Sequence, residues 1–506
     1  MMPSIKDIEK GYFEYVKKIM DFEEAISLMA WDLRTGAPKK GAEQRSEVIG
    51  TLSSEVFQMS TSEEMRYYID ALTDPSVQDE LSEKTRRSVA YSKKEYDKNV
   101  KIPEQEYKDY VILQAKAESI WEEAKEQADF GMLQPYLEKI VAYKRRFVEY
   151  WGHAGNPYDR LLDLYEPGVT VQMIDKVFGE LREQIVPLVQ EISDARERPQ
   201  TSFLYKPFAK EKQRAFSLHI LKEIGYDFDG GRLDETGHPF AISLNPGDVR
   251  VTTRYDEKDF RTAVFGTIHE GGHALYEQNI SNELTGTPLA NGTSMGIHES
   301  QSLFFENFVG RHFAFWEKYY DSLKQFADGQ FDSVSLEDFY KAINVSCPSL
   351  IRLEADELTY PLHIIIRYEI EKALFNDGLE VGDLPGIWNE KYEEYLGLRP
   401  ENDREGVLQD IHWSGGDFGY FPSYALGYLY AAQFKHAMLN DIPRFDDMLK
   451  EGNIKPIREW LTANIHQYGR MKKPAEILKD ATGEELNAKY LIDYLSKKYR
   501  NVYQLV

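Results

Sequence analysis

The chain has 506 residues and a formal net charge of −24, with 61 Lys and Arg against 85 Asp and Glu. This acidic excess argues against binding to a phosphate backbone, so we expect no nucleic-acid partner. The sequence has no run of about 18 uncharged apolar residues, which excludes a membrane-spanning helix, and its single cysteine, Cys347, excludes an intramolecular disulfide. Together with an N-terminus that lacks the apolar core of a signal peptide, these features predict a cytoplasmic protein.

Helical patterns dominate the first half of the chain. Apolar residues recur with helical spacing from Ile5 to Ile26, and Ser4 with Asp7 has the spacing of a capping box. We expect this helix to end near Trp31, before a turn that contains Gly and Pro. Further helical patterns occupy residues 43–57, 82–100, 104–127, 132–152, 171–195 and 210–225. We therefore expect one domain over residues 1–506, with a helical N-terminal half (about 1–230) and a second half (about 231–506) that carries the motifs described next.

The pattern changes from about Gly237 onwards. Residues 249–253 read Val-Arg-Val-Thr-Thr, an alternation of β-formers that follows Gly and Pro turns. This segment is the best strand prediction in the chain. It immediately precedes the segment from residue 256 onwards, which carries the metal-binding motif described next. The edge strand of a small sheet at that place could hold an extended peptide by backbone hydrogen bonds.

The central motif is His269-Glu270-Gly271-Gly272-His273, an H-E-x-x-H sequence. On a helix its two histidines share one face and can reach a single metal ion, and Glu270 can take a proton from a water molecule there. Chance would give only about 0.04 such matches in a chain of this composition. We expect the helix to begin near Asp256, with Asp259 completing a capping box. The two glycines each cost about 1 kcal/mol relative to Ala, and a close approach by another backbone would explain them.

A catalytic zinc site takes three protein ligands, so a third ligand is needed. The metzincin pattern requires Gly and His at positions that Tyr276 and Asn279 occupy here, which excludes that class. Glu277 lies on the same helix as both histidines, and ligands at i, i+4 and i+8 would span about 12 Å along the axis. The third ligand should therefore come from another segment.

The best candidate for the third ligand is Glu299, in a segment that reads as the next helix. His298 and Glu306 remain alternatives. An acidic residue four positions after such a glutamate often orients a ligand histidine, but that position holds Leu303. The orienting carboxylate must then come from elsewhere, with Asp356 as a candidate.

At this point the residues carry a family resemblance. Six motifs in series, and a seventh segment near the N-terminus, resemble those of the carboxypeptidase Taq family. They are His238-Pro239-Phe240; Asp248, Arg250 and Thr252; His269 to His273; His298 to Gln301; Ile351 and Arg352 with Ala355 and Asp356; Gly406 to Trp413; and residues 30–41, where Leu33 stands in place of a common Gln.

The resemblance implies a mainly α-helical fold, similar to the neurolysin and angiotensin-converting-enzyme group. In this fold a deep groove runs between helical halves, with a small β-sheet beside the metal site. It also implies a zinc-dependent carboxypeptidase of broad specificity that acts on peptides with a free C-terminus and forms a homodimer. We expect one Zn²⁺ per chain, held by His269, His273 and Glu299, and Co²⁺ or Mn²⁺ could replace it because imidazole and carboxylate ligands are not selective.

Further roles follow from the same motifs. Similar His and Tyr donors serve related enzymes, so His412 and Tyr424 are candidates to stabilise the tetrahedral intermediate, with Tyr420 as the rival of Tyr424. Packing alone is an equal explanation for either tyrosine.

A carboxypeptidase must also recognise a free carboxylate, for which Arg is the natural bidentate partner. We prefer Arg352 for this role, place Arg250 in support, and include His238 among the substrate-binding residues. Either arginine could instead pair with a nearby carboxylate such as Glu354, Asp356 or Asp248.

Two other functions remain open. The nearer one is a zinc oligoendopeptidase or dipeptidyl carboxypeptidase of the same fold group. The more distant one is a helical scaffold whose metal site is only structural, although a structural site has no need of the general base that Glu270 provides.

Overall fold

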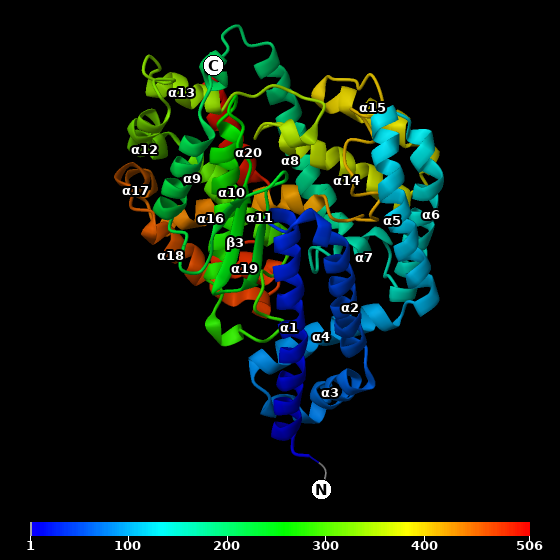
Figure 1. Cartoon of the computed structure of the whole chain (residues 1–506). Helices are drawn as coiled ribbons and strands as arrows, with labels where there is room; N and C mark the ends of the chain where they lie inside the picture. Colours follow the sequence, from blue (N-terminus) through cyan, green and yellow to red (C-terminus); the bar gives the residue numbers. More distant parts are fainter. Residues whose placement is uncertain (1–2, 506) are drawn as a thin grey trace.

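The computed structural model describes residues 3–505, and it is mainly helical (Figure 1). Its first helix, α1 (Ile5–Thr35), begins as predicted. The Ser4 side chain accepts a hydrogen bond from the Asp7 amide, and the Asp7 carboxylate accepts one from the Ser4 amide, which confirms the capping box. The helix ends at Thr35, one turn beyond the predicted Trp31, because the Gly36 amide still closes a turn on the Asp32 carbonyl.

The first four helices of the chain, which lie within residues 5–100, pack around an apolar cluster of their own, which includes Tyr12, Ile19, Ile69 and Val89. At its far end α1 reaches the sheet, where the rings of Trp31 and Phe240 lie 5.5 Å apart. A much larger core joins the remaining helices. The helices before the sheet are α2 (Ala42–Ser60), α3 (Glu63–Thr73), α4 (Glu83–Val100), α5 (Glu104–Gln127), α6 (Phe130–Trp151), α7 (Tyr158–Leu162), α8 (Val171–Ser193) and α9 (Lys210–Ile224).

A three-stranded sheet follows, made of β1 (Leu233–Glu235), β2 (Ala241–Asn245) and β3 (Asp248–Thr253). The strand order is β1-β3-β2, with β1 parallel and β2 antiparallel to β3. Strand β3 confirms the predicted strand, and its Val249 and Val251 are fully buried. Strand β2 lies at an edge of the sheet, so one side of its backbone is free of sheet pairing.

Helix α10 (Arg261–Gln278) carries the H-E-x-x-H motif and begins five residues later than predicted. The Asp256 and Asp259 side chains accept hydrogen bonds from the Lys258 and Arg261 amides, so they stabilise the turn before the helix and form no capping box. An apolar stripe at helical spacing, from Phe260 through Val264 and Ile268 to Leu275, is buried.

The remaining helices follow α10 in the chain, and the first of them packs directly against it. They are α11 (Met295–Leu303), a π-helix that continues it (Phe304–Gly310), α12 (Phe313–Phe326), α13 (Leu336–Ile343), α14 (Tyr360–Asn376), α15 (Leu384–Leu396), α16 (Pro422–Asp441), α17 (Phe445–Glu451), α18 (Lys455–Asn464), α19 (Pro474–Thr482) and α20 (Lys489–Val502). Across residues 3–505, none of the helices combines the length and the apolar character that a membrane span needs.

A close approach of backbones explains Gly272. A Cβ atom there would lie 2.5 Å from the Gln301 carbonyl oxygen and 2.7 Å from the Ser302 Cα, both on α11. On the other side of α11, a Cβ at Gly427 of α16 would lie 2.7 Å from the Glu299 Cβ. Helix α11 is therefore held between two backbones at the point where it carries Glu299.

We predict that Gly272→Ala lowers the unfolding temperature, because the added methyl group would overpack this contact at a cost of about 1–3 kcal/mol. The control is Gly266→Ala in the same helix, where an added Cβ meets nothing within 4 Å. The control should stabilise the helix by up to about 1 kcal/mol. Calorimetry measures the unfolding temperature of both variants. If both variants shift this temperature in the same direction relative to the native protein, the backbone contact is contradicted.

Candidate active site

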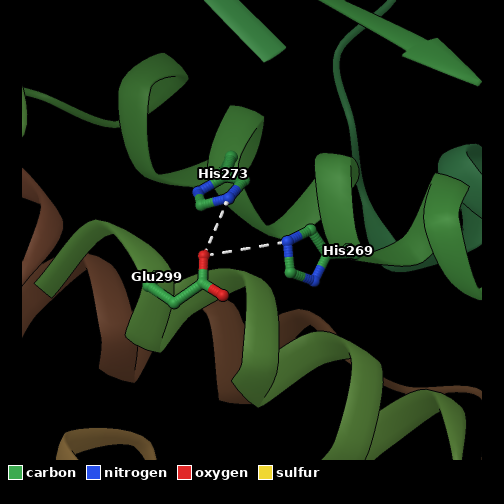
Figure 2. Close-up of side chains that lie close together, drawn as sticks. All are labelled: His269, His273 and Glu299. Atoms are coloured by element: carbon green, nitrogen blue, oxygen red, sulfur yellow. Dashed lines mark ion pairs between the residues drawn. The ribbon is translucent and has the colours of Figure 1, made fainter. Parts of the chain in front are cut away.

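Three side chains converge at the contact between α10 and α11. Helix α10 presents His269 and His273 one turn apart, and α11 directs Glu299 toward them (Figure 2). The Glu299 Oε2 lies 3.8 Å from the His269 Nε2 and 3.4 Å from the His273 Nε2. One ligand atom from each residue falls within 4.8 Å of the other two. The structure thus brings together the three predicted ligands.

The spacing of these atoms fits a metal ion. Ligand atoms about 2.0–2.2 Å from a tetrahedral zinc ion lie roughly 3.3–3.6 Å from each other, close to the separations of Glu299 from the two histidines. Two imidazoles and one carboxylate are also a ligand set that catalytic zinc sites use. The residues present therefore fit a zinc ion and leave a coordination position for water.

His269 is oriented by Glu306, which lies on the π-helix after α11. The His269 Nδ1–H donates to the Glu306 Oε2 at 2.9 Å, and Arg311 donates to the other carboxylate oxygen at 3.0 Å. Burial alone would lower the pKa of His269, but the charges of Glu299 and Glu306 outweigh it and raise that pKa to about 10. A bound metal ion must therefore displace a proton from this imidazole.

His273 is oriented through a second histidine. Its Nδ1 lies 2.6 Å from the His298 Nδ1, and the His298 Nε2 lies 2.9 Å from the Glu277 Oε1. The carboxylate can only accept, so His298 carries its proton on Nε2 and accepts from His273 on Nδ1. Burial lowers the pKa of His273 to about 4, so its Nε2 lone pair is free for a metal ion.

These contacts show where the alternative candidates lie. Glu306 and His298, the rivals for the third ligand, hydrogen-bond the outer nitrogens of the two histidines, as supporting groups at metal sites do. Asp356 instead accepts hydrogen bonds from the Cys347, Leu358 and Thr359 amides, so it shapes a loop.

Glu270 lies beside the metal ligands and is 8% exposed. Burial is the main reason that its pKa is raised to about 7, and the neighbouring carboxylate of Glu299 adds to the effect. A carboxyl group with such a pKa can both accept and return a proton near neutral pH.

The three ligands and Glu270 line a cavity of about 640 Å³. Its wall also includes Arg352, Tyr360, Tyr420 and Tyr424. The cavity is large enough for the end of a peptide, and its buried cation and hydroxyl groups can bind charged or polar atoms of that peptide.

Arg352 is buried in this wall and is held by Asp410. The Arg352 Nε and Nη2 donate to the two Asp410 oxygens at 3.1 and 2.9 Å, and its guanidinium lies 5.4 Å from the ring centre of Tyr424. The third nitrogen, Nη1, has only a long contact of 3.5 Å with the Tyr360 hydroxyl. Arg352 does pair with a carboxylate, but with Asp410 rather than with Glu354 or Asp356.

The predicted hydroxyl donors lie side by side. The Tyr424 and Tyr420 hydroxyls are 3.3 Å apart, and both residues line the cavity. His412 stacks on the Tyr420 ring at 5.6 Å and is not part of the cavity wall. Its buried Nδ1 has no hydrogen-bond partner within residues 3–505, and burial lowers the pKa of this imidazole to about 3.

The other two predicted substrate-binding residues lie outside the cavity wall. Arg250 on β3 forms a bidentate pair with Asp248 at 2.7 and 2.6 Å and lies over the ring of Trp31. His238 is exposed in the turn before β2, although Pro239 next to it lines the cavity.

Sequence reasoning gave no role to Asp410 or Arg311. Asp410 belongs to the motif of residues 406–413, and its position two residues before His412 was a usable signal. Arg311 had no such signal, because its contact with Glu306 depends on the π-helix between them.

The chain is similar to known proteins over nearly its whole length. The sequence model of the carboxypeptidase Taq (M32) metallopeptidases matches residues 11–499. Carboxypeptidase 1 of Bacillus subtilis (strain 168) is 60% identical over 501 residues, which are 99% of this chain and 100% of that protein. Thermostable carboxypeptidase 1 of Thermus thermophilus is 42% identical over 487 residues, which are 94% of this chain and 95% of that protein. The solved structure of the M32 carboxypeptidase from Deinococcus radiodurans R1, 36% identical, superposes with a TM-score of 0.95 over 98% of this chain and 99% of that chain.

The contact between Glu306 and His269 yields a prediction about metal binding. Glu306→Gln should weaken zinc affinity by about 10- to 100-fold, because a neutral amide orients the imidazole less strongly than a carboxylate. Competition with a fluorescent chelator measures the affinity. Glu317→Gln is the control, because Glu317 on α12 pairs with Lys450 on α17 and neither residue lines the cavity. Equal zinc affinity in the two variants would show that Glu306 does not support the site.

Proposed function

The chain belongs to the carboxypeptidase Taq (M32) family and is a metallocarboxypeptidase, and we propose that it uses zinc to release single residues of broad specificity from peptide C-termini. One observation carries this proposal. The cavity that contains His269, His273, Glu299 and Glu270 also contains a buried arginine, Arg352. Such a cavity can hold both a scissile peptide bond and the terminal carboxylate next to it.

The chemistry divides between the metal and the chain. When bound, zinc supplies Lewis acidity, which lowers the pKa of water toward about 7 and polarises a carbonyl group. Glu270 accepts a proton from the attacking water and passes it to the leaving amine. Its pKa of about 7 suits both steps.

The tyrosines supply hydrogen bonds to the developing oxyanion. Tyr424 is the proposed donor, and Tyr420 supports it through the contact between their hydroxyls. His412 acts through its stacking on Tyr420, so we propose that it positions this pair of hydroxyls.

Arg352 is the proposed partner of the substrate carboxylate. Asp410 holds two of its nitrogens, which fixes the plane of the guanidinium and leaves Nη1 for the substrate. Burial strengthens this interaction because water competes poorly for either partner.

Three further expectations remain predictions. They are the homodimer that the family resemblance implies, a cytoplasmic location, and replacement of zinc by Co²⁺ or Mn²⁺. Arg250 and His238 are proposed to support substrate binding indirectly, through the sheet and its preceding turn.

Product masses test the reaction directly. Zinc-loaded protein should convert a mixed peptide set into ladders that shorten by one C-terminal residue, and a chelator should stop the reaction. Glu270→Gln should lower kcat by about 10²- to 10⁴-fold, because it removes the proton acceptor. The control is Glu283→Gln, at an exposed position on a turn.

The other outcomes are equally clear. Two-residue steps would assign a dipeptidyl carboxypeptidase, internal fragments an oligoendopeptidase, and no products a metal-binding scaffold. Retained activity in the Glu270→Gln variant would overturn the proposed proton transfer.

The role of Arg352 is tested with peptides that have a free or an amidated C-terminus. Arg352→Gln should lower kcat/KM on free peptides by about 10²-fold or more, because it removes a buried charge-assisted contact worth about 2–5 kcal/mol. The preference for a free over an amidated terminus should then disappear. Arg250→Gln should keep that preference. Loss of the preference in the Arg250 variant alone would move the carboxylate site to β3.

A further inference from the structure

A second cavity, of about 760 Å³, adjoins the metal cavity. The two share Ala241, Met295 and His298 in their walls. A peptide substrate bound at the metal site can therefore extend from one cavity into the other. We call this second cavity the basic cleft because six of its lining residues are cationic, namely Arg87, Lys94, Arg160, Arg470, Lys472 and Lys473.

Three of these cations, Arg160, Arg470 and Lys473, form no direct ion pair in the part of the chain that the structure describes. The charge of Arg470 nevertheless acts on the carboxylates of Glu23 and Glu277. Arg160 donates to the Gly152 carbonyl oxygen, and Arg470 donates to the Tyr91 hydroxyl at 2.9 Å. The charge of Arg160 is therefore available to a ligand, and so is that of Lys473, because Glu476 beside it already pairs with Arg87.

The acidic residues of the basic cleft already have partners. Glu95 pairs with Lys98 at 2.5 Å and Asp163 with Lys94 at 2.7 Å, whereas Glu277 accepts a hydrogen bond from the neutral His298 at 2.9 Å and its charge is compensated by Arg470. A chain with a net charge of −24 thus gathers unpaired positive charge at one cavity beside its metal site. Such a concentration of one sign attracts ligands of the opposite sign.

Strand β2 gives the direction of a peptide that occupies both cavities. Pro239, Phe240 and Ala241 line the metal cavity, whereas Ala241, Ile242 and Ser243 line the basic cleft. A peptide whose C-terminal carboxylate is bound at Arg352 then has its upstream residues beside Ser243. It runs antiparallel to β2, along the edge that is free of sheet pairing.

We propose that the basic cleft binds the substrate residues upstream of the scissile bond and selects acidic side chains there. The proposal rests on the function proposed above, because it takes the terminal carboxylate to lie at Arg352. The selection is electrostatic, so it acts on Asp and Glu at the second and third residues before the scissile bond. It weakens as salt screens these exposed charges.

The test uses N-acetylated peptides of equal length with Asp, Asn or Lys at those two positions. At low salt, kcat/KM for release of the C-terminal residue should be about three- to tenfold higher with Asp than with Asn, and lower again with Lys. In about 1 M salt, where the Debye length is about 3 Å, the three peptides should converge.

The double variant Arg160→Gln, Lys473→Gln should bring the ratio of the Asp to the Lys peptide close to one. The control is Lys108→Gln, Lys116→Gln, which removes the same charge from exposed positions of α5 that line neither cavity. It should retain the ratio of the native protein. A ratio near one in the native protein, or a ratio that survives in the double variant, overturns the proposal.

An N-acetylated dipeptide separates this proposal from the function beneath it, because it is too short to reach the basic cleft. If the dipeptide loses its C-terminal residue but the longer peptides show no charge preference, the inference fails and the carboxypeptidase function stands. If zinc-loaded protein releases no C-terminal residue from any peptide, the proposed function itself fails.

Discussion

The active site depends on one steric constraint, the contact between the backbones of α10 and α11. Gly272 allows Gln301 and Ser302 to lie against α10, and Gly427 allows α16 to lie against Glu299 from the other side. Metal sites tolerate errors of only about 0.2 Å in ligand distance. A methyl group at either glycine would displace α11 by more than this, so the packing of three helices sets the geometry of the ligands.

The same contact buries several charged side chains beside hydrogen-bonding partners. Glu306 lies between His269 and Arg311, whereas His273 leads through His298 to Glu277. Burying a charge is costly unless it is paired and hydrogen-bonded. The two ligand histidines consequently differ, because His269 holds a proton that carboxylates stabilise while His273 is neutral. Metal capture is therefore linked to pH mainly through His269.

Local patterns in the sequence predict much of the structure, because they depend on neighbouring residues. The capping box at Ser4, strand β3 and the shared face of the two histidines follow from helical and strand periodicity. The start of α10 does not, since Asp256 and Asp259 resemble helix caps in sequence while they stabilise a turn. The residues that support the active-site side chains are equally hard to predict from the sequence. Asp410 is 58 residues from Arg352, and the mainly helical architecture around them came from the family resemblance.

The two apolar clusters of the molecule have a mechanical consequence for the basic cleft. One wall of this cleft belongs to α4, which packs with the N-terminal helices, whereas the metal ligands belong to the large core. The walls are joined mainly by polar contacts, including Arg87 with Glu476 at 3.0 Å and Tyr91 with Arg470 at 2.9 Å, and the Tyr91 ring also packs against the large core. Such contacts are weak beside apolar packing. The width of the cleft is thus held less firmly than the geometry of the metal ligands, so we expect that peptides of different bulk can widen the cleft without moving those ligands.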